Sequence, residues 1–213
     1  MWIRLFGLFA LLMLSACGTS RQMLAPGDAA AHYTTLANRE VSCAEGDRGC
    51  NGAHLVKGEA CLRLASAGEE RFQSCAVRHL ALGIDMAAQE GSRSGVEQPY
   101  FESLMEALRL RRDRAATRTE AAPFAAQLES RARVFRKRFP DAPAGYYYLL
   151  SARLKRALDA AEASPAVACR ALDDAQTLLE DAPSDRGLYG PDFSRAAGEL
   201  RSLQATVPGC ADA

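Results

Sequence analysis

Side chains that could bind a metal or form disulfides gather in one stretch of the chain. Cys43, Cys50 and His54 are spaced C-x6-C-x3-H, and Cys61 follows them. Thiolates and imidazoles bind Zn²⁺, but this spacing differs from that of compact zinc knuckles. Paired cysteines can instead form disulfides, which persist where the compartment is oxidising. The compartment in which the chain works therefore decides between the two chemistries.

The remaining residues do not form a recognisable catalytic set. The chain has three histidines, His32, His54 and His79. His79 falls on an apolar helical stripe, where a hydrogen-bonded core histidine is a better expectation than a catalytic base. The sequence has no Gly-x-Ser-x-Gly elbow, no phosphate-binding glycine loop and no Cys-x-x-Cys pair. We therefore expect no catalytic residues, no metal, no cofactor and no enzymatic activity.

The first 16 residues have the layout of an export signal. Arg4 precedes an apolar run from Leu5 to Ala16, and these 12 residues are too few for a spanning helix, which needs roughly 20. A short basic segment, an apolar segment and small residues before a cleavage point are typical of a secreted chain. We therefore expect residues 1–16 to be a signal peptide. The cysteines that follow would then meet an oxidising compartment, which favours disulfides over zinc.

Residues 14–17, Leu-Ser-Ala-Cys, resemble the lipobox of bacterial lipoproteins. The resemblance implies cleavage before Cys17, a diacylglycerol on its thiol and an acylated N-terminus, and two or more acyl chains anchor stably. It also implies the periplasmic face of the outer membrane of a Gram-negative cell, because Gly18 is not the Asp that retains such proteins in the inner membrane. An ordinary secretory signal followed by an unmodified Cys17 is the alternative. Residues 17–28 are expected to form a lipidated tether, and residues 29–213 a single domain.

Charge is spread unevenly along the chain. The cleaved protein would carry a net charge of −1, which gives no indication of nucleic-acid binding. Residues 103–160 nevertheless carry a net charge of +7, and residues 164–213 carry −4. Part of the positive charge is the arginine cluster of residues 109–114, which we expect at the end of a helix, where cations complement the helix dipole.

Apolar residues recur at steps of three and four from Ala29 onward, with no sustained alternation, so the sequence predicts an all-α fold. Short loops between the helices favour stacked antiparallel hairpins. Ser164 and Pro165 together form a typical helix start, with a capping hydroxyl and a first-turn proline. We expect about eight helices, marked by residues 29–39, 55–65, 72–87, 101–108, 124–139, 146–161, 165–179 and 191–203.

Six cysteines follow Cys17, an even number that is typical of disulfides in an exported chain. In the expected hairpins, cysteines on facing helices lie at similar distances from the turn that joins the helices. This geometry favours three local pairs, subject to the Cα separation that a disulfide tolerates. Exchange of partners among the first four cysteines is the main alternative. The favoured pairs are Cys43 with Cys50, Cys61 with Cys75, and Cys169 with Cys210.

Helical hairpins with small residues at their crossings resemble tetratricopeptide repeats. The best stretch is residues 135–157, with the sequence FRKRFPDAPAGYYYLLSARLKRA, and residues 55–85 are a second candidate, with Gly58 at the tight-packing position. The match covers about half of the cleaved chain and implies a TPR-like α-solenoid. In its repeats and its expected anchor, the chain is similar to periplasmic repeat lipoproteins of two kinds. One is the repeat subunit of the β-barrel assembly machinery, and the other comprises lipoproteins that partner the solute-binding proteins of TRAP transporters.

The basic stretch from Arg131 to Arg156 is the most site-like feature of the sequence. Such charges are commonly a solvated face, but they could also dock an anionic lipid or an acidic partner surface. Three consecutive tyrosines, residues 146–148, adjoin it, and at least one is expected to be exposed because they cannot all face one stripe. The candidate partner-binding residues are Arg133, Arg136, Arg138, Tyr146, Tyr147 and Arg153.

These observations favour a membrane-anchored helical-repeat lipoprotein that acts as a protein–protein interaction scaffold or adaptor in the cell envelope. Its partners would be the membrane, through the anchor on Cys17, and an envelope or periplasmic protein, and no nucleic acid. The alternative is a transport accessory or small-ligand-binding lipoprotein with an apolar channel between hairpins. A deep pocket lined by side chains such as Phe135, Phe139 and Tyr147 would favour that alternative.

Overall fold

A computed structural model describes residues 26–43, 47, 49–89 and 97–210. The described residues form eight α-helices and two single-turn 3₁₀ helices, with no strand, which confirms the all-α prediction. The 3₁₀ helices are η1 (Glu70–Phe72) and η2 (Gly187–Tyr189). The α-helices are α1 (Pro26–Asn38), α2 (Cys50–Ser66), α3 (Gln73–Gln89), α4 (Glu97–Asp113), α5 (Arg118–Arg138), α6 (Pro143–Ala160), α7 (Pro165–Asp181) and α8 (Gly190–Thr206).

Local signals in the sequence mark the starts of four of the eight described α-helices. The hydroxyl of Thr117 accepts a hydrogen bond from the Glu120 backbone N–H at 3.2 Å and so caps α5. Prolines occupy the first turn of α6, α7 and α8, where a missing N–H costs nothing. Ser164 precedes α7 as expected, but its side chain makes no capping hydrogen bond. The proline alone is therefore the start signal there.

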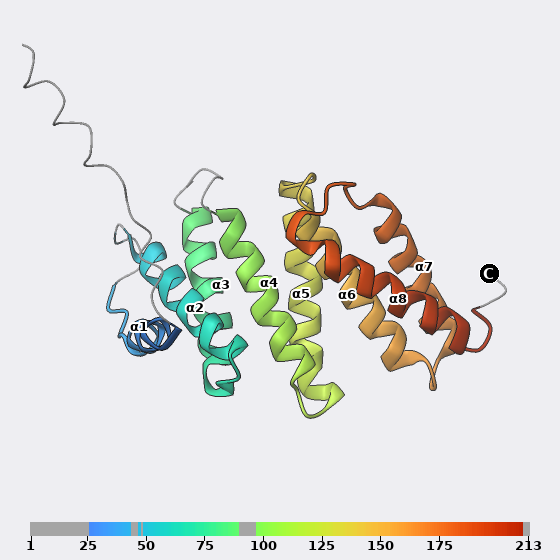
Figure 1. Cartoon of the computed structure of the whole chain (residues 1–213), viewed down its shortest axis with the longest axis horizontal. Coiled ribbons are helices and arrows are strands. Elements are labelled where there is room, and N and C mark those ends of the chain that lie inside the picture. The colour runs from blue at the N-terminus through green and yellow to red at the C-terminus, as the bar shows by residue number, and fades with distance from the viewer. Residues whose placement is uncertain (1–25, 44–46, 48, 90–96, 211–213) are drawn as a thin grey trace, which may run out of the picture.

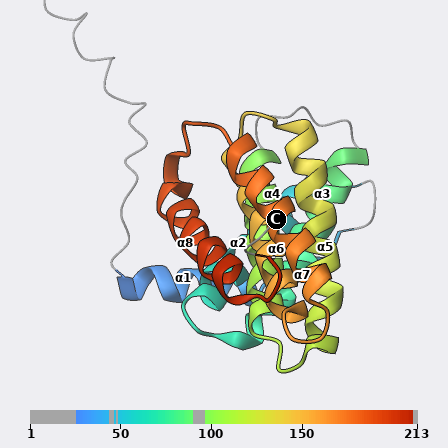
Figure 2. The same cartoon turned by 90° about the vertical axis from the view of Figure 1, so that its right-hand side faces the viewer.

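Successive helices pack against one another as stacked hairpins, and α1 and α7 lie toward opposite ends of the array (Figure 1). Viewed from the end, α2, α4 and α6 form one row and α3, α5 and α7 a second, while α8 lies beside the first row (Figure 2). The stacked-hairpin prediction is thereby confirmed, with α8 as an additional layer.

Small residues allow α2 and α3 to approach closely. A Cβ atom added at Gly58 would lie 2.7 Å from the Leu80 backbone nitrogen, and one at Gly83 would lie 2.7 Å from the Leu55 side chain. Gly58 therefore occupies the tight crossing that the sequence predicted for it.

One continuous core runs through the array, because each hairpin buries its apolar stripe against the next. Its largest fully buried side chains come from five of the α-helices in both rows and from α8. They are Phe135, Phe193, Leu80, Leu104, Met105, Leu108, Leu128, Leu150, Leu172 and Leu200.

Three disulfides brace the fold, and their pairing is the one favoured from the sequence. Cys43 pairs with Cys50, Cys61 with Cys75, and Cys169 with Cys210, at Cα separations of 5.7, 5.9 and 5.2 Å. The first closes the segment before α2, the second joins α2 to α3, and the third fastens the end of α8 to α7.

The expected signal peptide and Cys17 lie outside the described residues. Pro26 begins α1, so the last three residues of the expected 17–28 tether belong to this helix. In the described part of the chain, no helix combines the length and the apolar character needed to cross a membrane.

Candidate functional site

The predicted docking residues of α5 do not all lie free on a basic face. Arg133 is exposed and forms an ion pair with Glu129 one turn earlier. The guanidinium carbon of Arg136 lies 5.2 Å from the centre of the Tyr146 ring, so this pair joins α5 to α6. Arg138 is exposed, and its guanidinium lies over Phe139. Arg136 therefore contributes to the packing of α5 against α6 and is not simply a free charge on the surface.

Arg153 lies between two carboxylates on different helices. Its Nη2 is 3.0 Å from Glu129 of α5, and its Nε is 3.1 Å from Asp174 of α7. The side chain is 12% exposed, and its Nη1 atom is buried without a hydrogen-bond partner. Arg153 therefore holds α5, α6 and α7 together, and little of it is available to a partner.

The three tyrosines of α6 point to different neighbours, and none is exposed. Tyr146 faces Arg136, whereas the Tyr147 ring lies 5.4 Å from that of Tyr189 and 6.0 Å from that of Phe193. Tyr148 is buried. The expectation of an exposed tyrosine was wrong, because α6 contacts α5, α7, α8 and η2 and so presents several buried faces. The six predicted residues consequently do not form one surface.

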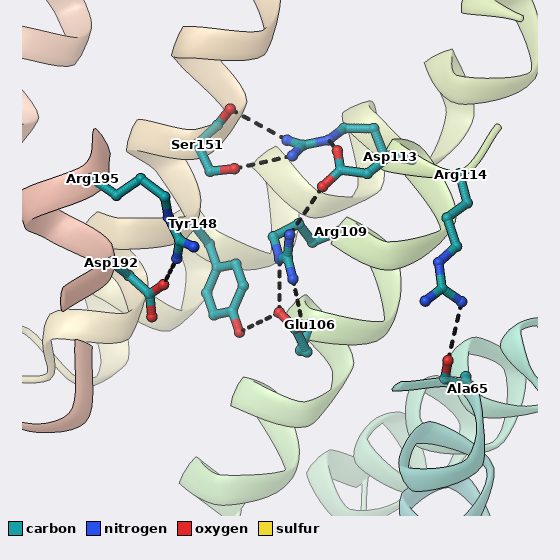
Figure 3. A network of polar contacts seen from close by, with 10 residues as sticks. Ala65, Glu106, Arg109, Asp113, Arg114, Tyr148, Ser151, Asp192 and Arg195 are labelled. Carbon is teal, nitrogen blue, oxygen red and sulfur yellow. Dashed lines mark hydrogen bonds and ion pairs between the residues drawn. The ribbon is translucent and has the colours of Figure 1, made fainter. Parts of the chain in front are cut away.

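The face of the α2–α4–α6 row carries a connected polar network instead (Figure 3). Arg109 of α4 donates to Glu106 at 2.7 Å and to Asp113 at 3.0 Å. Arg112, which is buried, donates to Asp113 at 2.7 Å and to the Ser151 hydroxyl of α6 at 3.0 Å. Arg112, one of the arginines expected to complement the dipole at the end of α4, thus bridges α4 to α6, whereas both partners of Arg109 lie within α4.

The C-terminal segment closes over part of this face. The Tyr189 hydroxyl of η2 donates to Glu102 of α4 at 3.0 Å, and the Tyr148 hydroxyl donates to Glu106 at 3.2 Å. Burial, together with the neighbouring carboxylates, raises the pKa of both tyrosines above the usual value of 10. Both phenols therefore stay protonated and serve as fixed donors. Phe193 of α8 is fully buried, and its ring packs against that of Tyr147.

Two hollows lie on this face, and hydrogen-bonded polar side chains line part of each. One lies between α4, α6 and α8, where charges of both signs meet. The other lies between α2, α4 and η2. Because their walls contain the hydrogen-bonded groups of the network, we interpret this face as a structural junction. Residues around the first hollow include Arg112, Asp113, Lys155, Asp192 and Arg195, and residues around the second include Glu59, Arg63, Glu102 and Glu106.

A groove of a different character runs between the first half of α5 and the last half of α6. It encloses about 440 Å³, and five alanines line it: Ala121, Ala122, Ala125, Ala126 and Ala152. Charged residues form its rim, namely Arg118, Lys155 and Arg156 against Glu129 and Asp159, and the buried Arg112 also lines it. Alanine side chains are too short to fill the space between the two helices, so an apolar floor remains accessible. We call this feature the alanine groove.

The rim of the alanine groove retains excess positive charge. Lys155 forms an ion pair with Asp159, and Arg118 lies 3.8 Å from the same carboxylate. Arg156 is exposed and has no ion pair among the described residues. An apolar floor with a polar rim is the usual composition of a protein interface. The basic stretch expected to be site-like, residues 131–156, contributes only Ala152, Lys155 and Arg156 to this groove. The sequence did not reveal the groove, because alanine occurs in filled cores as well as beside unfilled space.

Two histidines and two cysteines lie close together near the start of α2. The Nδ1 atoms of His54 and His79 lie 2.7 Å apart, and the two rings stack at 4.9 Å. Burial, with help from Arg78 and Lys57, lowers the pKa of His54; the pKa of His79 is lowered to about 4, mainly by its own burial. His79 is half-buried and hydrogen-bonded, as a structural histidine would be.

Ligand atoms of Cys43, Cys50 and His54 all lie within 4.8 Å of one another. Cys61, the fourth potential ligand in the sequence, lies about three turns farther along α2, where it is fully buried and bonded to Cys75 of α3. The four residues therefore do not form one site. The sulfurs of Cys43 and Cys50 are joined, which agrees with the preference for disulfides over zinc.

No protein family model matches the sequence, and no curated protein and no solved structure matches it either.

Proposed function

We propose that this chain is a membrane-anchored helical-repeat lipoprotein that works as an adaptor in the bacterial envelope. In this proposal the acylated Cys17 holds the domain at the periplasmic face of the outer membrane, and the domain binds a protein partner without catalysing a reaction. Tethering confines the domain to a surface and so raises its effective concentration near other envelope components. The lipobox and the apolar segment before it support the anchor.

The alanine groove is the observation that carries the binding proposal. Five alanines provide an apolar floor, and the exposed cation of Arg156 has no ion pair among the described residues. The partner that fits is an acidic amphipathic helix, whose apolar side would cover the floor while its carboxylates approach Arg118 and Arg156. Such a helix would remove apolar surface from water and neutralise the excess charge of the rim.

A small-ligand or transport-accessory role has less support. It would need an apolar channel lined by side chains such as Phe135, Phe139 and Tyr147. Phe135 is fully buried, its ring lies 4.9 Å from that of Phe139, and Tyr147 packs on Phe193. These aromatic rings fill space between helices, so an accessible groove for a partner helix is the better supported reading.

The docking proposal is tested in cells with the full lipidated chain and a photo-crosslinker at position 126, on the groove floor. Ala122→Trp should fill the groove and Arg156→Glu should reverse the rim charge, so each should abolish the crosslinked product. The matched controls are Ala205→Trp and Arg201→Glu on exposed positions of α8, which should leave it intact. Equal crosslinking in all four variants would refute docking in the groove. Crosslinks to phospholipid alone would refute a protein partner.

The anchor is tested separately, by Cys17→Ala. The wild-type protein should incorporate labelled palmitate and sediment with the membranes. The variant should lose the label, and the protein should no longer sediment with the membranes. Membrane association of the unlabelled variant equal to that of wild type would contradict an acyl anchor at Cys17.

A further inference from the structure

The disulfide between Cys43 and Cys50 lies beside His54, which pairs with His79, and no docking role requires these two histidines. Cys50 is the first residue of α2, and His54 follows one turn later on the same helix. The two sulfurs and a ring nitrogen of His54 lie within 4.8 Å of one another. Metal–sulfur and metal–nitrogen bonds of about 2.3 and 2.0 Å could therefore converge on one ion after small movements.

We propose that reduction of this disulfide creates a binding site for one thiophilic metal ion, Cu⁺ or Zn²⁺, held by Cys43, Cys50 and His54. A dithiol reductant supplies two electrons and two protons, so that the S–S bond opens to two thiols while the dithiol becomes a disulfide. The metal then displaces the two thiol protons and binds both thiolates and the imidazole. Two sulfurs and one nitrogen are a ligand set that selects these soft or borderline ions.

Among the three disulfides, this one is best suited to open and close. It spans a sequence separation of 7 residues, against 14 and 41 for the others, so opening it releases the shortest loop. Cys43 is half-buried, which leaves the bond within reach of a reductant, whereas Cys61 is fully enclosed by the core. The helices should therefore stay folded when the Cys43–Cys50 bond is reduced.

His79 is in position to orient the metal-binding histidine. Its Nδ1 lies 2.7 Å from Nδ1 of His54, which leaves Nε2 of His54 for the metal. A hydrogen bond to the nitrogen that does not bind the metal commonly fixes the ring of a ligating histidine, and losing it typically costs 10- to 100-fold in affinity. His79 is thus a positioning residue, and it comes from α3, so the site would depend on the packing of α3 against α2.

The test uses the full chain, reduced with dithiothreitol and desalted without oxygen. Zn²⁺ and Cu⁺ are each titrated in competition with a chromogenic chelator, and native mass spectrometry counts the bound ions. We expect one ion per reduced chain and none on the oxidised chain. Cys50→Ser and His54→Gln should abolish binding, and His79→Gln should weaken it 10- to 100-fold. Cd²⁺ bound to the reduced chain should show a thiolate charge-transfer band that Cys50→Ser removes.

The control for other thiols is the double variant Cys169→Ser/Cys210→Ser, which should bind as the wild type does. Circular dichroism of each variant establishes that the helices remain. A reduced wild-type chain that takes up neither ion would overturn the proposal. Binding that survives in His54→Gln, or that is equal in the oxidised chain, would overturn it as well.

Discussion

The hydroxyl of Tyr189 donates to the carboxylate of Glu102, which precedes it by 87 residues and lies 3.0 Å away. This bond joins η2, at the entrance to α8, to the middle of the array. Tyr189→Phe should lower the free energy of unfolding by about 1.5–3 kcal/mol, the usual contribution of a hydrogen bond to a charged group. Urea denaturation at pH 7 measures the change. Tyr100→Phe on α4, whose hydroxyl forms no hydrogen bond among the described residues, should change it little.

Two arginines that share one carboxylate should differ in their contribution to stability. Arg153, 12% exposed, bridges Glu129 and Asp174, whereas Arg133, 62% exposed, contacts Glu129 from the surface. Arg153→Met should cost about 2 kcal/mol of unfolding free energy, between the values for exposed and fully buried ion pairs, because it removes ion pairs with two carboxylates from a largely buried side chain. Arg133→Met should cost less than about 0.5 kcal/mol, as exposed ion pairs do. Equal effects in denaturation experiments would contradict a clamping role for Arg153.

Two glycines of α2 should respond in opposite ways to the same substitution. A Cβ at Gly58 would lie 2.7 Å from the Leu80 backbone, so Gly58→Ala should force α3 away and destabilise the fold by roughly 1–3 kcal/mol. Nothing lies within 4 Å of a Cβ at Gly52, so Gly52→Ala should stabilise it by about 0.5–1 kcal/mol. Thermal unfolding of the two variants should show melting temperatures on opposite sides of the wild type.

The histidine pair should make stability depend on pH. Burial and nearby cations lower the pKa of His79 from 6.5 to about 4 and lower that of His54 as well. Between pH 6.5 and about 4, the unfolded chain binds protons at these histidines that the folded chain does not. The contribution of the pair to the free energy of unfolding is therefore fully present above pH 6.5 and is lost as the pH falls toward about 4. Denaturation of the oxidised chain in the presence of a chelator should show this slope.

The double variant His54→Gln/His79→Gln should flatten that slope across the same window. His32→Gln, which removes an exposed histidine of α1, serves as its control. A slope that persists in the double variant would assign the pH dependence to other groups.

The helices were predictable because their signals are local. Pro143, Pro165 and Pro191 mark helix starts, and apolar steps of three and four residues mark the buried stripes. The disulfides followed from the same reasoning, since a hairpin places Cys61 and Cys75 at similar heights on facing helices. Where a helix buries only one face, the period of its apolar residues is enough to predict the helix and the side that packs against its neighbour.

Contacts that depend on the placement of several helices were not predictable. Tyr147 and Arg153 belong to α6, which packs against neighbours on several sides. A prediction that assigns one buried face to each helix could not show which neighbour these two side chains contact. The pairing of His54 with His79 joins residues 25 apart on different helices. The alanine groove is a shortage of side-chain volume, and no residue type in the sequence distinguishes an unfilled space from a filled one.

The disulfide between Cys169 and Cys210 can form only late in the synthesis and folding of the described domain. Cys210 follows α8, so this bond can form only after α8 has been synthesised. Until then α6 and α7 lack the cover of Phe193 and its neighbours, and the unfinished domain leaves apolar surface open to aggregation. The newly made protein therefore exposes this apolar surface until α8 has been made, and a variant that lacks Cys210 would have no covalent link between α7 and the segment after α8.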